Sequence, residues 1–417
     1  MVDAACEWRL RGNPTWFVVP KPRRPFPSGI GRPTVVELLD KQLPEEQPNR
    51  LEPIVGSEFE LGTTAYRAHV YARAALRTVP VGVPILVSDD AAAWQAADTL
   101  AGRNPFLGVL HADDAWYYDL ASRYRASVSA FVAVSRRVAA RVQMIANEYG
   151  TPVATIPCGV KLPLLVDPKS ERYDLRSAAR LVWIGRADDR QKRVSDLPAI
   201  VEELSALGVR FRLDIIGDGY DLPLIRRGLS RATAPHVHFH GWLPSEAVNP
   251  MLSVADVLLL PSNFEGMPVV AMEALAHGCA VVASNASGLD EYDGRADTRA
   301  CVWIHEVGDT VSAARAVQSA LSSTREARRA QARQFAAAEF AIATCMGRYA
   351  SLLSGLVPRQ RLPPVRPPSW LASRIVASGI AAARRGRRWL ATSFAGVSAG
   401  ANGSDDMPRE GRAARLV

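Results

Sequence analysis

The feature that most constrains this chain is an alternation of short apolar segments with helix-like segments, which runs through the sequence twice. Strands that are continuously apolar and alternate with helices favour a parallel sheet covered on both faces. The alternation stops at Pro157-Cys158-Gly159-Val160 and then restarts. The sequence therefore predicts two α/β sheets. A ligand site is expected in the cleft where the carboxyl ends of their strands face each other.

The predicted elements divide the 417 residues as follows. In the first round, the strands are 15–20, 51–56, 83–88, 105–111, 129–135 and 153–157, and the helices are 34–43, 64–76, 91–101 and 136–150. In the second round, the strands are 180–185, 212–217, 237–241, 256–261, 279–284 and 301–305, and the helices are 196–208, 223–231, 268–278 and 310–321. We expect domains at 1–157 and 158–333, a C-terminal helix at 334–356 that packs back towards the first domain, and a basic tail at 357–417.

The net charge of the chain lies in its tail. Lys and Arg number 50 against 42 Asp and Glu, which gives +8. Residues 358–417 contain eleven arginines and three acids, so this segment alone accounts for the whole excess. The rest is close to neutral, which argues against a nucleic-acid partner. With 48% hydrophobic and 22% charged residues, the composition excludes a disordered chain and a multi-span membrane protein.

The five cysteines, at 6, 158, 279, 301 and 345, form no C-x-x-C pair. The sequence therefore predicts neither a disulfide framework nor a zinc site, and favours a reducing compartment. We expect no signal peptide and no transmembrane helix, and hence a cytoplasmic protein.

Within the tail, residues 369–394 combine aromatic and aliphatic side chains with clustered arginines. One interpretation is an amphipathic helix that lies on an anionic membrane surface, at the inner face of the membrane. The alternative is a basic helix that packs on the protein or binds a partner.

Two carboxylates with seven residues between them follow the predicted strand 256–261. Glu265 lies in a loop and Glu273 near the start of a helix, which begins close to Pro268. The backbone N–H groups of 266–270 then form an anion site. Glu273 is suited to hold a ribose diol, and Glu265 the hydroxyls of a sugar. The alternative is a solvated loop acid and a helix-start acid favoured by the dipole.

Residues 256–291 resemble the E-x7-E region of the retaining family 4 (group 1) glycosyltransferases, which have the GT-B fold. The resemblance covers Pro261-Ser262, Glu265-Gly266-Met267-Pro268, the run from Gly278 to Ser284, and Gly288-Leu289-Asp290-Glu291. It implies two Rossmann-like domains that face a cleft. It also implies a nucleotide-sugar donor held at Glu273, Gly266, Met267, Pro268 and Val269. The acceptor it implies is a hydroxyl group, for which a lipid-linked molecule and a glycan are both candidates.

Further matches lie upstream. Gly185-Arg186 ends a strand and Lys192 follows it, and in the family these cations hold the donor diphosphate, whose charge grows as it leaves. The alternative is that both are surface charges. Arg193 stands where the family has glycine. Gly217, in Gly217-Asp218-Gly219, and Leu243, after Phe239-His240-Gly241, match the turn beside the donor and the element beside the base.

The first half matches more loosely. His111 ends the strand Leu107–Leu110, and in the family such a histidine approaches the transferred sugar, although an ordinary polar strand end is the alternative. Cys158 replaces an asparagine of the family. Gly29 and Gly31 stand for a glycine-rich loop near the donor phosphates, but Ile30 interrupts it, and a plain turn is the alternative.

No two aspartates are separated by one residue, so the chain lacks the D-x-D motif that holds a metal in another glycosyltransferase fold. We therefore expect neither a metal nor another cofactor. The resemblance implies front-face attack with retention, with Glu265, His111, Arg186 and Lys192 as catalytic groups, in cell-surface polysaccharide or glycolipid synthesis. Two alternatives remain: a nucleotide-sugar epimerase, and a degenerate GT-B protein that serves as a binding or regulatory subunit.

Overall fold

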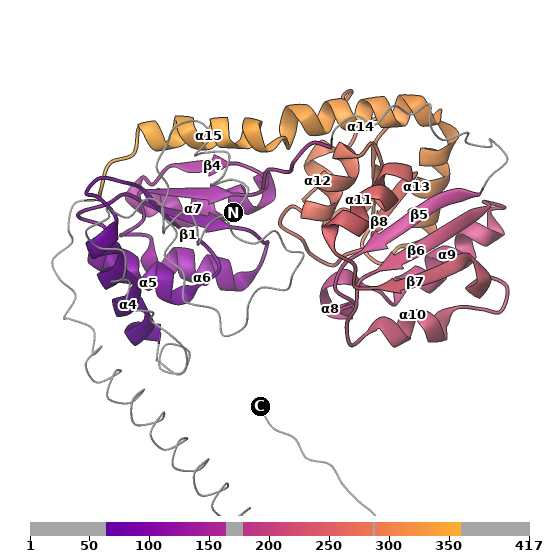
Figure 1. Cartoon of the computed structure of the whole chain (residues 1–417), viewed down its shortest axis with the longest axis horizontal. Helices are drawn as coiled ribbons and strands as arrows, with labels where there is room; N and C mark the ends of the chain where they lie inside the picture. The colour runs from indigo at the N-terminus through magenta and orange to yellow at the C-terminus, as the bar shows by residue number, and fades with distance from the viewer. Residues whose placement is uncertain (1–63, 164–177, 287, 360–417) are drawn as a thin grey trace, which may run out of the picture.

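The structure, a computed structural model, describes residues 64–163, 178–286 and 288–359. The strands predicted at 15–20 and 51–56, the helix at 34–43, the glycines Gly29 and Gly31, and the tail segment 369–394 lie outside the described residues. Figure 1 shows two sheets side by side, with two long helices along one side of both.

The first sheet has four parallel strands in the order β1-β2-β3-β4. They are β1 (Ile85–Val87), β2 (Phe106–Leu110), β3 (Ala130–Ala133) and β4 (Val153–Thr155). The helices between them are α4 (Thr64–Thr78), α5 (Ala91–Leu100), α6 (Ala115–Tyr124) and α7 (Arg136–Ala146), followed by the 3-10 turn η1 (Asn147–Tyr149). β2 and β3 are buried along their whole length, as expected for strands covered on both faces.

The second sheet has six parallel strands in the order β10-β9-β8-β5-β6-β7. They are β5 (Ala179–Ile184), β6 (Phe211–Ile216), β7 (Val237–Gly241), β8 (Val257–Leu260), β9 (Ala280–Ser284) and β10 (Val302–His305). Read from β7, this is the Rossmann order, in which the chain switches direction across the sheet between β5 and β8. Ligands of such sheets bind beyond the carboxyl ends of the strands at the switch.

The helices of this part are α8 (Asp189–Lys192), α9 (Asp196–Ala206), α10 (Leu222–Gly228), α11 (Ser245–Val254), α12 (Val269–Ala276), α13 (Thr310–Ser322), α14 (Arg325–Glu339) and α15 (Ile342–Ser354), with 3-10 turns η3 (Ala234–His236) and η4 (Asp290–Tyr292). The sequence did not predict α6, α8 or α11. α8 is a single turn, α11 carries Pro250 inside, and α6 depends on a cap: the Asp114 carboxylate accepts the N–H of Trp116 at 2.8 Å.

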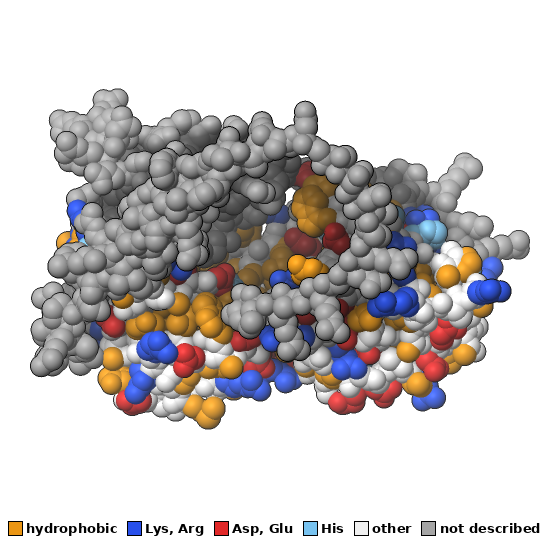
Figure 2. All heavy atoms as spheres, turned by 90° about the horizontal axis from the view of Figure 1, so that it is seen from below, with side chains coloured by type: hydrophobic (Ala, Val, Ile, Leu, Met, Phe, Trp, Pro, Cys, Tyr) orange, Lys and Arg blue, Asp and Glu red, His pale blue; other side chains and the backbone are white. Residues whose placement is uncertain are grey.

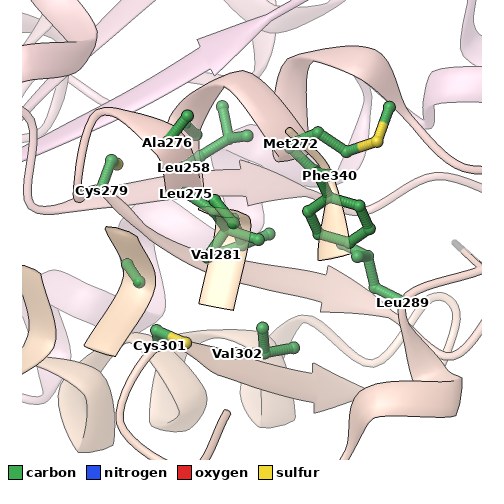
Figure 3. Packing of buried hydrophobic residues seen from close by; sticks show 14 of the residues in the cluster. Leu258, Met272, Leu275, Ala276, Cys279, Val281, Leu289, Cys301, Val302 and Phe340 are labelled. Atoms are coloured by element: carbon green, nitrogen blue, oxygen red, sulfur yellow. The ribbon is translucent and has the colours of Figure 1, made fainter. Parts of the chain in front are cut away.

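Each face of the second sheet has its own core. On one face Trp183 and Leu213 pack with α9 and α13, and on the other Leu258 and Val281 pack with α12 and α14. Figure 3 shows the second of these, where Met272, Leu275, Leu289 and Phe340 converge on the sheet. Cys279 and Cys301 are free thiols in this core, and burial raises the pKa of each to about 12, so they act as small apolar groups.

The first sheet is covered on one face by a helix from the far end of the chain. Side chains of α4 to α7 pack on the face that presents Phe106 and Phe131, whereas Cys345 and Met346 of α15 pack on the opposite face, against Leu107. Figure 1 shows α14 over the second sheet and α15 over the first. The chain passes between the two sheets near Val160 and again near Ala341, and these two segments are hydrogen-bonded to each other. The Val160 N–H donates to the Phe340 carbonyl at 2.8 Å, and the Ile342 N–H donates to the Val160 carbonyl at 2.9 Å.

Arginines of α14 satisfy the carbonyls at the ends of neighbouring helices. Arg328, which is 4% exposed, donates to Ala320 and Ser323 at the end of α13, and also meets the buried Asp256 carboxylate at 3.3 Å. Arg325 donates to Val254 at the end of α11 at 2.6 Å. Because terminal carbonyls lack partners within their own helix, these contacts fasten α14 to the second sheet. No helix in the described part of the chain is long and apolar enough to cross a membrane.

Candidate active site between the two sheets

The switch point of the second sheet brings the predicted cations and the first glutamate together. Gly185-Arg186 follows β5, Lys192 ends α8, and Glu265 lies in the loop after β8. Because β5 and β8 are neighbours in the sheet, Lys192 and Glu265, which are 73 positions apart in the sequence, meet at one edge. This is the place where ligands of a Rossmann-type sheet bind.

Lys192 and Glu265 form a buried ion pair. The Lys192 Nζ lies 2.5 Å from the Glu265 Oε1, and the side chains are 14% and 8% exposed. The Ser262 hydroxyl donates to the same oxygen at 2.9 Å, and the Gln191 amide lies 3.4 Å from the other. The sequence suggested Lys192 and Glu265 as separate site residues. In the structure they form one hydrogen-bonded ion pair, in which each charge fixes the position of the other.

Arg186 contrasts with Lys192. Its side chain is 70% exposed, and its contact with the Asp188 carboxylate is 3.4 Å long. An exposed pair of this kind holds its partners weakly. The Arg186 guanidinium is therefore free to turn towards an anionic ligand at the end of β5.

Arg193 occupies a left-handed backbone position, with a φ of 47°. It is the one non-glycine residue with positive φ in the described part of the chain. This explains why a glycine suits the position in the related family. Here hydrogen bonds of the Arg193 side chain offset the cost of this backbone conformation. Its guanidinium donates to the Asp196 carboxylate at 2.6 and 3.0 Å and to the Asn263 amide oxygen at 3.2 Å.

Two glycines allow backbone segments to touch where no side chain would fit. A Cβ on Gly217, which has a φ of 130°, would lie 1.8 Å from the Gly185 carbonyl oxygen. A Cβ on Gly266 would lie 2.0 Å from the His111 carbonyl oxygen. Gly217 thus holds the turn after β6 against the end of β5. Gly266 lets the loop of the second sheet lie directly on the first.

The remaining residues that the sequence predicts to hold a donor surround the start of α12. Met267 is buried and Pro268 caps the helix, whereas Val269 is exposed at its first turn. Glu273 lies one turn further along α12 and is partly buried. Leu243, from the loop after β7, packs partly buried against the core beneath α12. The first amides of α12 therefore open towards the same edge of the sheet as Arg186.

His111 brings the first sheet to this site. It follows β2 directly, and burial lowers the pKa of its imidazole. The Cys158 Sγ lies 3.3 Å from its Nδ1, and burial raises the pKa of that thiol. Both groups are therefore held in their neutral forms. The sequence singled out Cys158 only as a departure from the related family, so its contact with His111 was missed.

A second contact joins the two sheets through the loop at 288–291. The Glu291 carboxylate accepts the Arg136 N–H at the start of α7 at 2.6 Å, and the Arg137 guanidinium meets the Asp290 carboxylate at the same distance. Burial raises the pKa of Glu291. The resemblance included Asp290 and Glu291, but it did not predict that they contact Arg137 and Arg136 at the start of α7.

A cavity of about 300 Å³, the central pocket, lies between the two sheets. Figure 2 shows acidic, basic and hydrophobic side chains gathered near the middle of the face seen from below. The first-sheet wall of the pocket is Ala112, Asp114, Trp116 and Tyr117, and the second-sheet wall is Arg186, Asp188, Arg190, Gln191 and Phe264. No cluster of three or more His, Cys, Asp or Glu side chains suited to a metal ion occurs among the described residues.

Residues 178–323 match the family model described as "Glycosyl transferases group 1". This chain contains a group 1 glycosyltransferase domain. The matched segment spans β5 to α13, which is the whole second sheet with Arg186, Lys192, Glu265 and Glu273.

Curated relatives are similar over parts of the chain. A putative colanic acid biosynthesis glycosyltransferase, WcaL, of Salmonella typhimurium is 40% identical over 96 residues, 21% of this chain and 24% of the relative. The lipopolysaccharide 1,6-galactosyltransferase of Escherichia coli is 31% identical over 111 residues, 26% of this chain and 30% of the relative. The putative teichuronic acid glycosyltransferase TuaC of Bacillus subtilis is 26% identical over 207 residues, 46% of this chain and 49% of the relative. In each case the chain spans less than half of the relative's length.

Solved structures match more of the chain. A trehalose-6-phosphate structure from E. coli, bound with UDP-2-fluoro glucose, has a TM-score of 0.58 and 14% identity, over 71% of this chain and 78% of that one. Anabaena HepE in complex with UDP has a TM-score of 0.55 and 16% identity, over 69% and 82%. These likenesses confirm the predicted GT-B fold.

Proposed function

We propose that the protein is a retaining glycosyltransferase that moves a sugar from a nucleoside diphosphate sugar to an acceptor hydroxyl. The observation that carries the proposal is the meeting of Arg186, the Lys192–Glu265 pair and the start of α12 at the switch point, directly opposite His111. Such an edge offers fixed positive charge to a diphosphate and carboxylates to the sugar and ribose.

In this mechanism the acceptor oxygen attacks the anomeric carbon on the face from which the diphosphate leaves. The bond from that carbon to the phosphate oxygen breaks, and the acceptor proton passes to the departing phosphate oxygen. Arg186, Lys192 and the amides at the start of α12 stabilise the charge that grows on the leaving group. The protein works by positioning and charge, so no carboxylate needs to attack the sugar.

The other residues bind the donor. Glu273 holds the ribose diol, and Glu265, fixed by Lys192 and Ser262, orients the sugar. Gly266, Met267, Pro268 and Val269 bring backbone to the phosphates, and Gly217 and Leu243 border the nucleoside. Neutral His111 approaches the transferred sugar from the first sheet. In the proposal these cations take the place of a metal ion.

The cellular role follows the names of the relatives. Those names refer to colanic acid, lipopolysaccharide and teichuronic acid biosynthesis, which favours a cell-surface polysaccharide or glycolipid as the product. We place the protein in the cytoplasm at the inner face of the membrane, held by residues 369–394, on the ground of their composition. Deleting residues 358–417 should abolish co-sedimentation with anionic liposomes, and unchanged co-sedimentation would contradict this placement.

The donor site is tested by a thermal-shift series with UDP, GDP and ADP, each with and without EDTA. A nucleotide at ~100 times its Kd should stabilise the protein by about 2.7 kcal/mol. We expect one nucleotide to stabilise in EDTA, and the effect to shrink in Glu273→Gln and Arg186→Gln. The matched change Arg231→Gln, at an exposed arginine of the same sheet region, should leave it intact.

Turnover of the sugar form of that nucleotide then decides the reaction. Transfer with retention supports the proposal, and an epimerised donor identifies an epimerase. A protein that binds no nucleotide and transfers no sugar would be the degenerate binding or regulatory subunit.

A further inference from the structure

An exposed indole stands in the first-sheet wall of the central pocket, on the side opposite the donor residues. Trp116 lies in the first turn of α6 and is 42% exposed, although it is among the largest apolar side chains of the protein. Large apolar side chains left open inside a pocket mark ligand contacts rather than core packing. None of the donor roles proposed above uses it.

The indole packs against a neighbouring ring that is itself anchored. The Trp116 and Tyr117 rings meet edge to face, with centroids 4.9 Å apart and an interplanar angle of 81°. The Tyr117 hydroxyl in turn donates to the Asp89 carboxylate, and burial and this carboxylate raise the pKa of Tyr117, which keeps the proton in place. The Asp114 cap fixes the backbone N–H of Trp116 at 2.8 Å. Such a platform needs little reordering when a ligand binds.

The polar part of the pocket surrounds this platform. Asp114 and Asp188 supply acceptors, Arg186 and Arg190 supply donors, and Gln191 supplies both. A flat apolar face beside groups that both donate and accept hydrogen bonds suits a pyranose sugar. A pyranose ring has an apolar C–H face, which can lie on the indole, and an edge of hydroxyls, which can bond to the polar groups.

We propose that Trp116 stacks on the pyranose ring of the acceptor, so the acceptor is itself a glycoside rather than a simple alcohol. The inference rests on the proposed glycosyl transfer and names its second substrate. A nucleobase also stacks on aromatic rings, but Trp116 projects from the first sheet, whereas Gly217, Leu243 and the start of α12 all belong to the second. The acceptor sugar thereby has its hydroxyl presented across the pocket to the donor side.

Saturation-transfer difference NMR on the full chain tests this stacking without depending on turnover. Methyl α- and β-pyranosides of glucose, galactose, mannose and N-acetylglucosamine serve as probes, with UDP, GDP and ADP titrated separately. We expect transfer to the C–H protons of at least one pyranoside. The transfer should fall at least fivefold in Trp116→Ala and largely recover in Trp116→Phe. The matched change Tyr149→Ala, at a half-exposed aromatic of the same sheet region, should leave it unchanged.

Nucleotide affinity separates the inference from the proposed function. Loss of pyranoside contact in Trp116→Ala with nucleotide binding unchanged supports the acceptor platform. Weakened nucleotide binding in Trp116→Ala overturns it, since the indole would then serve the donor base. Absence of pyranoside contact in the wild type, or equal contact in Trp116→Ala, overturns it as well. Failure of all nucleotides to bind the wild type contradicts the proposed function and is seen before any Trp116 variant is compared.

Discussion

The two walls of the candidate site, of which the lining of the central pocket is only a part, differ in what they are made of. The second-sheet wall relies on backbone, with glycine turns, a helix start and one buried ion pair, whereas the first-sheet wall presents side chains such as Trp116 and His111. Backbone contacts restrict the sequence around them, because only glycine fits a close approach and only certain residues begin a helix. A wall of side chains leaves no such pattern, and it is free to change with the ligand.

The largest effect is expected from removing the Lys192–Glu265 ion pair of the second-sheet wall. Lys192→Met should lower turnover by ~10²–10³-fold, because a fixed charge at the leaving group is lost. It should also lower the free energy of unfolding by about 3–5 kcal/mol, because Glu265 is left buried without its partner. Urea unfolding and donor turnover measure the two effects.

The double variant Lys192→Met with Glu265→Gln separates them. Removing both charges should recover most of the unfolding free energy but none of the turnover. Equal stability of the single and double variants would show that the unpaired Glu265 carboxylate is not the cause of the loss.

The next effect concerns the place where the walls touch. Gly266→Ala puts a methyl group 2.0 Å from the His111 carbonyl oxygen and must push the walls apart. A misplacement of ~1 Å at reacting groups costs about 10²-fold in turnover. Gly347→Ala on α15, where a Cβ would meet nothing within 4 Å, is the matched control and should stabilise by roughly 0.5–1 kcal/mol. Wild-type turnover in Gly266→Ala would rule out a tight contact.

A smaller effect probes the side-chain wall through pH. Burial lowers the pKa of His111 in the folded protein. As the pH drops below about 6.5, the imidazole therefore becomes protonated in the unfolded chain before it does so in the folded protein, and the free energy of unfolding falls. This one group adds at most about 1.4 kcal/mol per pH unit. Between pH 7 and 5, His111→Asn should therefore lose less unfolding free energy than the wild type. Identical slopes for the wild type and His111→Asn would contradict the role of burial.

The smallest effect is expected where the sheets meet through partly exposed charges. The Arg137 and Asp290 side chains are 35% and 28% exposed, and pairs of this kind contribute roughly 0.2–1 kcal/mol. A double-mutant cycle with Arg137→Ala and Asp290→Asn should give a coupling in that range, reduced by added salt. A coupling well above it would mean that this contact, rather than Gly266, holds the walls together.

The same contrast explains what could be predicted from the sequence. The strands of both sheets in the described residues were predicted to within a few residues, because most of them are continuous apolar runs. Glu265 and Lys192 were both named, but their pairing was not, because it depends on β8 lying next to β5. Trp116 and Tyr117 went unnoticed, because α6 begins with a cap and aromatic residues rather than with an apolar period. At Arg193 the related family has a glycine, and the backbone here is left-handed. An arginine adopts this conformation because Asp196 and Asn263 hold its side chain.

The position of α15 has a consequence for synthesis on the ribosome. The sheet face that carries Leu107 and Val132 is complete once β4 has emerged, but its cover, Ile342–Ser354, is translated only after the entire second sheet. At ~5–20 residues per second, that face waits for about 10 to 40 s before the helix that packs on it is made. The first sheet therefore cannot finish folding in the order in which it is made. For that interval the nascent chain lacks the helix that packs on this apolar face, and of the helices in the described residues the last one to be translated is the one that covers it.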